Sequence, residues 1–330
     1  MQFKYLFICT TPLQILIAQN IILTKKLNKS DTLFIILYPK QNSIYINYIQ
    51  DISFKFKVLQ FPISTTSKIY FFFSLIKLRL FIKQQLQQYN FIHIYAASIF
   101  DICIQLVLSH TKFKDFKTFD DGTANLFIDS KFYQTQEKSN WYYSYTRFFL
   151  KIQFTTIKLR NLSKEHFTIF NEKIILREAP YIKHYIDITP KSLNLTQFHR
   201  TSNKTINIFL GAPWEVLDYN LNYIENLYIH ITDALYFKHP RETIHSSVFN
   251  YINSNLILED FIVNLLNENP SCKVNLYGLL STSLLTVANF PQVSCICIYD
   301  DNMKAQFKML LDTFAKGNVR LTPVADITNE

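Results

Sequence analysis

Paired carboxylates follow a strand predicted at residues 116–119, in a position where they could do chemistry. Asp120, Asp121 and Gly122 come directly after this predicted strand. A carboxylate at a strand end can accept a proton from a sugar hydroxyl or hydrogen-bond to it. The same residues could instead form an Asx turn that caps the following segment. The motif alone leaves both interpretations open.

A histidine occupies a comparable place in the second half of the chain. His239 follows the predicted strand at 234–237, and Pro240 fixes the turn after it. Lys238 and Arg241 lie on either side, and this setting suits a phosphate. Histidine can donate a hydrogen bond or a proton as charge develops on a leaving group. Without other evidence, a structural histidine at a turn is the favoured interpretation.

Glycine is rare, with only four residues in the chain, so its positions carry information. Gly122, Gly211 and Gly278 each lie just past a predicted strand, where glycine allows a left-handed backbone or close approach of a ligand. A tight turn without a ligand is the alternative at each position. The run Ser281, Thr282 and Ser283 then opens a predicted helix, where hydroxyl and N–H groups either bind an anion or serve as ordinary caps.

Two acidic residues, Glu259 and Asp260, lie in the first turn of a helix predicted at 258–268. They either stabilise the helix dipole or hold the hydroxyls of a ribose. The sequence contains no G-x-x-x-x-G-K-[ST], no G-x-G-x-x-G, no D-x-D and no His/Cys spacing typical of zinc. These absences argue against a P-loop and the usual dinucleotide or metal–diphosphate sites. We therefore expect chemistry without a metal or cofactor.

The elements that must position these residues alternate along the chain. In the first half, predicted strands are separated by predicted helices, and the same rhythm restarts in the second half; the strands are expected at 3–9, 32–38, 56–61, 91–95, 116–119, 205–210, 234–237, 273–277, 294–299 and 319–323. This pattern predicts parallel βαβ units and an α/β fold of two doubly wound, Rossmann-type domains facing a central cleft. We expect domains at 1–155 and 204–330, with a connecting region at 156–203.

The overall composition limits the partners and the compartment. The chain of 330 residues has a formal charge of +9, which suggests nucleic acid, an anionic membrane surface or a phosphorylated substrate. No helix-turn-helix, RNP or zinc-finger signal supports nucleic acid. Five cysteines without C-x-x-C spacing, and no convincing signal peptide or membrane span, predict a cytoplasmic protein. The basic, aromatic stretches 68–83 and 147–164 could contact the inner membrane peripherally, or simply pack with their charges in water.

The order of these features resembles the bacterial sialyltransferases, and the local sequence is most similar to glycosyltransferase family 52, the lipooligosaccharide sialyltransferases. The similarity extends over nearly the whole chain. It is carried by residues 11–14, 117–126, 165–170, 239–241, 258–262 and 289–291.

The resemblance implies a GT-B-like fold whose C-terminal domain binds the nucleotide of CMP-sialic acid. It further implies inverting, metal-independent transfer to a terminal galactoside of lipooligosaccharide, with an α-2,3 linkage expected. His239 would protonate or stabilise the departing phosphate, which the Ser281–Ser283 cluster would bind. Glu259 or Asp260 would hold the ribose or cytosine. The remaining substrate-binding residues implied are Thr11, Gln14, Asp120, Gly122, Gly211, Pro240, Arg241 and Gly278.

The catalytic base departs from the family pattern. The family places an aspartate directly after Gly-x-Pro at the end of the second domain's first strand, and Trp214 occupies that position here. Glu215 is the first candidate base and Asp218 the second. Related sialyltransferases of another family use the aspartate of Asp-Asp-Gly, which keeps Asp121 in contention.

Two alternatives to sialyl transfer remain. The same family includes glucosyl transfer, so another nucleotide sugar could be the donor. A non-catalytic protein that binds anionic glycolipid is the alternative from a different class. Relatives can dimerise by exchanging segments, so a homodimer also remains open.

Overall fold

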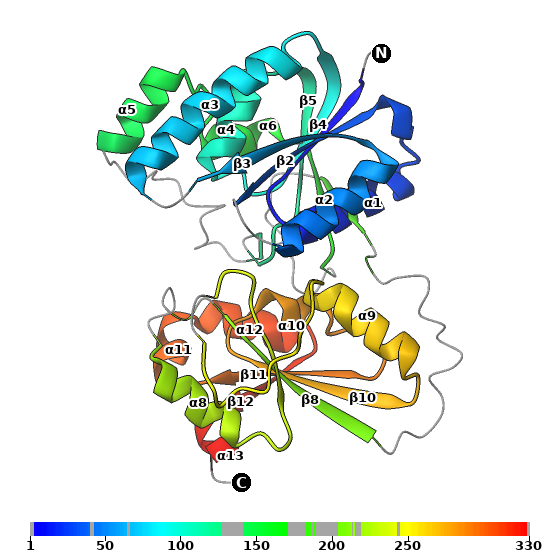
Figure 1. Cartoon of the computed structure of the whole chain (residues 1–330), viewed down its shortest axis with the longest axis vertical. Helices are drawn as coiled ribbons and strands as arrows, with labels where there is room; N and C mark the ends of the chain where they lie inside the picture. Colours follow the sequence, from blue (N-terminus) through cyan, green and yellow to red (C-terminus); the bar gives the residue numbers. More distant parts are fainter. Residues whose placement is uncertain are drawn as a thin grey trace. The chain divides into compact units, whose positions relative to one another are not determined.

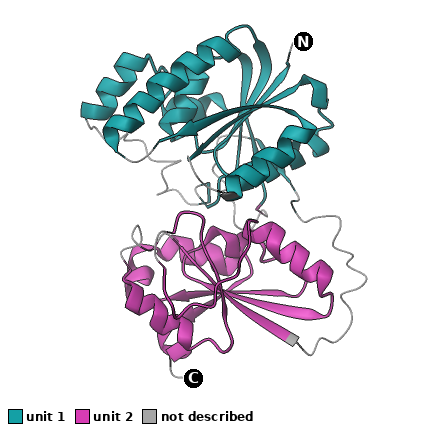
Figure 2. Cartoon of the chain, viewed as in Figure 1, with its two compact units in different colours: residues 1–169, 175–188 teal, residues 170–174, 189–330 magenta. Residues whose placement is uncertain are grey.

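The structure, a computed structural model, describes residues 3–39, 43–64, 67–123, 125–126, 141–170, 182–186, 188, 204–212, 214, 219–242 and 245–328. It divides the chain into two compact units (Figure 2): one comprises residues 1–169 and 175–188, and the other residues 170–174 and 189–330. Each unit is built on its own parallel sheet.

The first unit contains a seven-stranded sheet in the order β3-β2-β1-β4-β5-β6-β7, with every neighbouring pair parallel. The strands are β1 (Tyr5–Cys9), β2 (Thr32–Pro39), β3 (Lys57–Ile63), β4 (Asn90–Ala96), β5 (Lys112–Phe119), β6 (Glu165–Thr168) and β7 (Ile182–Tyr185). The chain builds outward from β1 in one direction and then, from β4, in the other. The pair β1–β4 is therefore the topological switch point, where doubly wound sheets bind ligands.

Helices cover both faces of this sheet (Figure 1). They are α1 (Pro12–Thr24), α2 (Ser43–Lys55), α3 (Lys68–Leu86), α4 (Ile102–Ser109), α5 (Trp141–Leu150) and α6 (Thr156–Leu162), with a short 3-10 turn at Lys29–Asp31. α1 and α2 pack together, as do α3 and α4. Thr11 caps α1 by accepting a hydrogen bond from the Gln14 N–H, and Pro12 supplies the favoured first helical residue.

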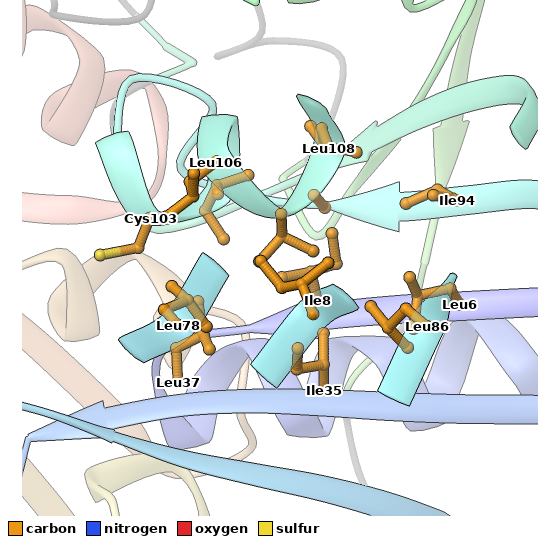
Figure 3. Packing of buried hydrophobic residues seen from close by; sticks show 14 of the residues in the cluster. Leu6, Ile8, Ile35, Leu37, Leu78, Leu86, Ile94, Cys103, Leu106 and Leu108 are labelled. Carbon is orange, nitrogen blue, oxygen red and sulfur yellow. The ribbon is translucent and has the colours of Figure 1, made fainter. Parts of the chain in front are cut away.

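The core of the first unit lies between the sheet and α3–α4 (Figure 3). Leu6, Ile8 and Ile35 from the central strands meet Leu78 and Leu106 from the two helices. β1 and β2 are almost entirely buried because a parallel sheet with helices on both faces leaves its central strands no contact with water. This explains why these strands are continuous apolar runs.

The second unit contains a five-stranded parallel sheet in the order β12-β11-β10-β8-β9. Its elements are β8 (Lys204–Leu210), α8 (Leu221–Ile229), β9 (Leu235–Phe237), α9 (Leu258–Glu268), β10 (Cys272–Gly278), α10 (Thr282–Thr286), β11 (Val293–Tyr299), α11 (Asp301–Gln306), α12 (Lys308–Lys316), β12 (Val319–Pro323) and α13 (Val324–Thr328). Its core is largely aromatic: Phe209, Trp214, Tyr236 and Phe249 are all buried.

The structure confirms the predicted strands and the doubly wound character of both halves, but it differs from the predicted boundary. α6, β6 and β7 fall within the predicted connecting region, and all belong to the first unit. β6 pairs with β5, and β7 pairs with β6. Both are four-residue strands with polar residues, so their position depends on an existing sheet edge and not on a local hydrophobic pattern. All five cysteines are buried and free, as predicted.

Candidate functional site

Polar side chains gather at the switch point of the first sheet. Thr10 and Thr11 follow β1, Ser98 follows β4, and Asp121 follows β5, so parallel pairing brings all of them to one edge. Ser98 has a left-handed backbone, with φ 44°. Such a conformation is unusual for a residue with a side chain and is concentrated at functional sites. The sequence did not single out Ser98, because a backbone angle leaves no signature in residue type.

The carboxylate of Asp121 is held from two sides. Gln14 donates from Nε2 to Oδ1 of Asp121 at 2.6 Å, and the Ser98 hydroxyl donates to Oδ2. Gln14 is fully buried, and its Oε1 accepts the Thr10 backbone N–H at 2.6 Å, which fixes the orientation of its amide. Gly122 follows with φ 80°, a conformation that favours glycine. The carboxylate of Asp121 thus sits in a fixed position at the edge of the sheet.

Asp120 has a different environment. It is fully buried, and its carboxylate accepts hydrogen bonds from the Ile169 N–H at 2.8 Å and from Asn125 Nδ2 at 2.8 Å. His166 Nε2 lies 2.9 Å from the same carboxylate, and His166 Nδ1 lies 2.9 Å from the Thr118 hydroxyl. This network ties β5 to β6. The structure thus gives Asp120 a buried, hydrogen-bonded position that favours a structural role, and contact between Asp120 and substrate stays a prediction.

We expect Asp120→Asn to destabilise the first unit by about 1–3 kcal/mol. The new amide would face donors, and a buried donor without an acceptor costs ~1–3 kcal/mol. Hydrogen exchange of peptides from β5 and β6, followed by mass spectrometry, measures the local free energy of opening. The matched control is Asp115→Asn on the same strand, whose half-exposed carboxylate should matter by less than about 1 kcal/mol. Equal protection in the two variants would contradict the structural role of Asp120.

In the second unit, the carboxyl ends of three neighbouring strands carry the predicted residues. Gly211 follows β8, His239 follows β9, and Gly278 ends β10, with β8 between the other two. A Cβ on Gly211 would overlap Glu242 Oε2 and would lie 2.9 Å from the backbone nitrogen of His239. Only glycine allows the turn after β9 to pack this closely against the end of β8. The structure thus brings Gly211 and the His239 turn together.

Glu242 holds this turn and was not identified from the sequence. The side chain is buried and accepts hydrogen bonds from the Tyr236 hydroxyl at 2.9 Å and from the His239 backbone N–H at 3.2 Å. Trp214 Nε1 in turn lies 2.9 Å from the Tyr236 hydroxyl oxygen, to which it donates. Trp214, which stands where the family has an aspartate, therefore belongs to the core. The only feature of the sequence that could have pointed to Glu242 is its position three residues after His239. That spacing does not predict a contact unless the geometry of the turn is known.

The imidazole of His239 has a defined protonation state. Its Nδ1 accepts the Arg241 backbone N–H at 3.1 Å, so the proton of the neutral ring resides on Nε2. Burial, and then the positive charge of Arg241, lower the pKa of His239 to about 4. The ring is therefore neutral at pH 7 and offers one hydrogen-bond donor. Protonation of the ring before a ligand binds is disfavoured.

The acidic pair on α9 divides into a buried and a half-buried residue. Glu259 is 4% exposed, and its carboxylate accepts a hydrogen bond from the Thr286 hydroxyl of α10 at 2.6 Å. Burial raises the pKa of Glu259. Its position between the helices is hard to reconcile with a contact to ribose, and Asp260 is the more accessible member of the pair. Ser281 occupies the N-cap position of α10 without a side-chain capping bond.

Two candidate bases cannot be placed. Glu215 and Asp218, like Pro213, lie outside the described residues. Asp121 is thus the candidate base whose surroundings are known. The residues that the structure describes include no group of three or more His, Cys, Asp or Glu arranged to hold a metal ion. Metal independence stays a prediction.

The two parallel sheets, each in its own unit, assign the chain to a known fold class. The fold is similar to that of the UDP-GlcNAc 2-epimerase from Neisseria meningitidis in complex with UDP-GlcNAc, with a TM-score of 0.58 over 99% of this chain and 90% of that one. At 12% sequence identity, this similarity concerns the fold alone. The chain has the GT-B fold, which consists of two Rossmann-type α/β domains.

Residues 29–300 match the profile of glycosyltransferase family 52, and the chain belongs to this family of enzymes. It is 26% identical to the N-acetyllactosaminide alpha-2,3-sialyltransferase of Haemophilus influenzae over 87% of this chain and 90% of that protein. It is also 26% identical to the CMP-N-acetylneuraminate:beta-galactoside alpha-2,3-sialyltransferase of Pasteurella multocida over 97% and 99% of the respective chains. The predicted fold and family are thereby confirmed.

Proposed function

We propose that this protein transfers sialic acid from CMP-sialic acid to a terminal galactoside of lipooligosaccharide, with inversion at the anomeric carbon and without a metal ion. The observation that carries the proposal is the turn after β9, where a neutral His239 with its proton on Nε2 lies beside Arg241. The leaving group of CMP-sialic acid is CMP, which carries a single phosphate. One hydrogen-bond donor and nearby cationic side chains suit that leaving group. The name of the Pasteurella multocida relative includes this donor, and the names of both relatives support an α-2,3 linkage.

The proposed reaction is one displacement. The acceptor hydroxyl oxygen forms a bond to the anomeric carbon of sialic acid, while the bond from that carbon to the phosphate oxygen of CMP breaks. The hydroxyl proton passes to a carboxylate. His239 Nε2–H donates a hydrogen bond to the departing phosphate and stabilises the charge that develops there. Attack opposite to the leaving group inverts the anomeric centre.

We assign the base to Asp121, with Glu215 and Asp218 as rivals. Hydrogen bonds from Gln14 and Ser98 fix the direction of the Asp121 carboxylate. A base that is already oriented needs no rearrangement when the acceptor arrives.

The remaining predicted site residues would bind the nucleotide in the second unit. Ser281–Ser283 would hold the phosphate through hydroxyl and N–H groups, and Asp260 would bind the ribose. Gly211 and Gly278 would keep the strand ends clear of side chains. Pro240 and Arg241 would shape the phosphate side of the turn, with the Arg241 side chain exposed to solvent.

The direct test incubates the protein with CMP-sialic acid and a fluorescent lactoside in the presence of EDTA, with UDP-glucose and UDP-galactose in parallel. We expect sialylated product at the same rate with and without EDTA, and NMR of the product gives linkage and anomeric configuration. Transfer from only a UDP-sugar would overturn the donor assignment while leaving the family intact. A rate that collapses with EDTA and returns with added Mg²⁺ would overturn metal independence.

A further inference from the structure

One exposed surface of the first unit is apolar, although the solvent-facing side of a surface helix is normally polar. We call it the aromatic–basic face, formed by the outward residues of α3 and α5. Its large apolar side chains are Ile69, Tyr70, Phe73 and Leu80 on α3, and Trp141, Tyr143, Tyr145, Phe148 and Phe149 on α5. Trp141 is 79% exposed and Phe148 is 85% exposed. Exposed apolar residues are common one at a time, but a contiguous group marks an interaction site.

The two helices form a common surface. α3 and α5 lie side by side (Figure 1). The Tyr142 hydroxyl donates to the Lys68 carbonyl at 2.8 Å, and Arg79 donates to the Phe149 carbonyl at 3.3 Å. The ring of Phe72 lies 5.7 Å from that of Phe149, centre to centre. The exposed rings are thus mounted on two packed helices.

The exposed residues of α3 follow the helical repeat. Ile69, Phe73, Lys77 and Leu80 recur at intervals of three or four, so they lie on one side of the helix. Ser74, Leu75, Leu78 and Ile82 on the other side are buried in the core. The helix is therefore apolar on both sides, and its outward side adds lysines. A helix that only needed to cover the sheet would have a polar outward side.

Basic residues accompany the exposed rings in the sequence. Residues 67–89 and 141–164, which include α3 and α5, contain nine Lys and Arg residues and not one acidic residue. The whole chain has 34 basic and 25 acidic residues, so the rest holds 25 of each and is formally neutral. Five of the nine basic residues belong to α3 and α5, and three of them, Lys68, Lys77 and Lys83 on α3, are exposed. The aromatic–basic face thus carries exposed lysines on a helix without an acidic residue.

We propose that the aromatic–basic face docks on the anionic phospholipid surface of a membrane, without spanning it. Tyrosine and tryptophan rings are favoured at the depth of the lipid headgroups, and lysines beside them attract anionic lipid. Charge complementarity favours this partner over a second copy of the chain, because two such faces would bring like charges together. No helix in the described part of the chain is long and apolar enough to cross a bilayer, so the docking would be interfacial.

Vesicle sedimentation tests the proposal with the full chain. Extruded vesicles of phosphatidylethanolamine and phosphatidylglycerol (about 70:30) are compared with pure phosphatidylcholine at low and high salt. We expect binding to the anionic vesicles that weakens as salt screens the lysines. The variant Lys77→Glu/Lys83→Glu should reduce the partition coefficient by about 30-fold or more, since each lysine near such a surface contributes roughly fivefold. The variant Trp141→Ser/Phe148→Ser should lose roughly tenfold per ring.

The matched control variants carry substitutions of the same kind at exposed positions outside the aromatic–basic face. Lys304→Glu/Lys308→Glu changes two exposed lysines of the second unit, and Leu23→Ser/Phe54→Ser removes two exposed apolar residues of α1 and α2. Both should bind vesicles within about threefold of wild type. Trp141 adds a local signal: its emission should shift to the blue with anionic vesicles, whereas Trp214 is already buried.

Two results would overturn the proposal. The first is vesicle binding by the face variants that equals that of the controls. The second is a dimer, detected by sedimentation velocity, that Trp141→Ser/Phe148→Ser dissociates while wild type ignores vesicles. That result would give the face to a second copy. Neither result bears on sialyl transfer to a soluble lactoside, which every face variant should retain.

Discussion

Replacing His239 with alanine should lower kcat for sialyl transfer by about 10²–10³-fold, the usual cost of removing one preorganised donor from a developing negative charge. The physical reason is the fixed tautomer: Nδ1 is occupied by the Arg241 N–H, so Nε2–H is the group available to the phosphate. Steady-state kinetics with CMP-sialic acid and a lactoside measure the effect. His239→Gln retains a donor near the Nε2 position and should recover activity to within about tenfold of wild type.

The control for this experiment is His230→Ala, which removes an exposed histidine at the end of α8. It should leave kcat within a factor of two. If His239→Gln is as inactive as His239→Ala while both remain folded, the ring supplies a proton and not only a hydrogen bond. If His239→Ala transfers at the wild-type rate, the residue has no part in the reaction, and the structural turn favoured from sequence alone is its whole role.

The same variant has a second readout in the stability of the second unit. The pKa of His239 is about 4 in the folded protein, below the usual value of 6.5, so the unfolded chain binds a proton more readily between these values. Stability therefore rises with pH across this window and falls as the solution is acidified from pH 6.5 to pH 4. His239→Ala removes this contribution. Its melting temperature should decline less steeply over the window than that of His230→Ala.

Asp121→Asn should reduce kcat by about 10²–10⁴-fold, the typical contribution of a general base. The amide cannot take the acceptor proton, but it has the shape of the carboxylate and should keep the fold. Because Asp121 belongs to the first unit and the proposed nucleotide site to the second, the dissociation constant for CMP should change by less than about threefold. Calorimetric titration with CMP separates loss of chemistry from loss of binding.

Three variants bracket this result. Glu215→Gln and Asp218→Asn replace the rival bases, and each should retain transfer to within about tenfold. Asp115→Asn replaces a half-exposed carboxylate on β5 and controls for charge. Full activity in Asp121→Asn together with a collapse in Glu215→Gln would move the base to the position first chosen from the sequence. Ser98→Ala should lower kcat by less than Asp121→Asn does, because Gln14 still holds the carboxylate.

The architecture was largely predictable because the buried strands of a parallel sheet appear in the sequence as runs of apolar residues. β1 and β2 are continuous apolar runs since both of their faces are covered, and β11 has a similar buried run in the second unit. β6 and β7 could not be predicted in the same way. Four residues such as Ile182–Tyr185 become a strand only because a partner edge supplies hydrogen bonds.

The candidate site was predictable by residue type and only partly by role. Asp120 and Asp121 are identical and adjacent, yet one is buried in a network with His166 and the other is held at the sheet edge. Both residues lie just past the end of β5, and Asp120 is the buried one because β6 supplies its partner His166. Glu259 and Asp260 divide in a similar way, because α10 packs over the first of them.

By itself, the sequence determined the order in which strands and helices follow one another along the chain. It also determined the strand-end positions of Asp121, Gly211 and His239, and the two basic segments without acidic residues. These follow from local composition and spacing. Only the tertiary structure decided that Gln14 and Ser98 hold Asp121, that Glu242 supports the His239 turn, and that α3 and α5 join their rings into one face. Each of these contacts joins residues on different elements or depends on the geometry of a turn. The stabilisation that each contact provides therefore depends on tertiary packing, which the local sequence does not encode.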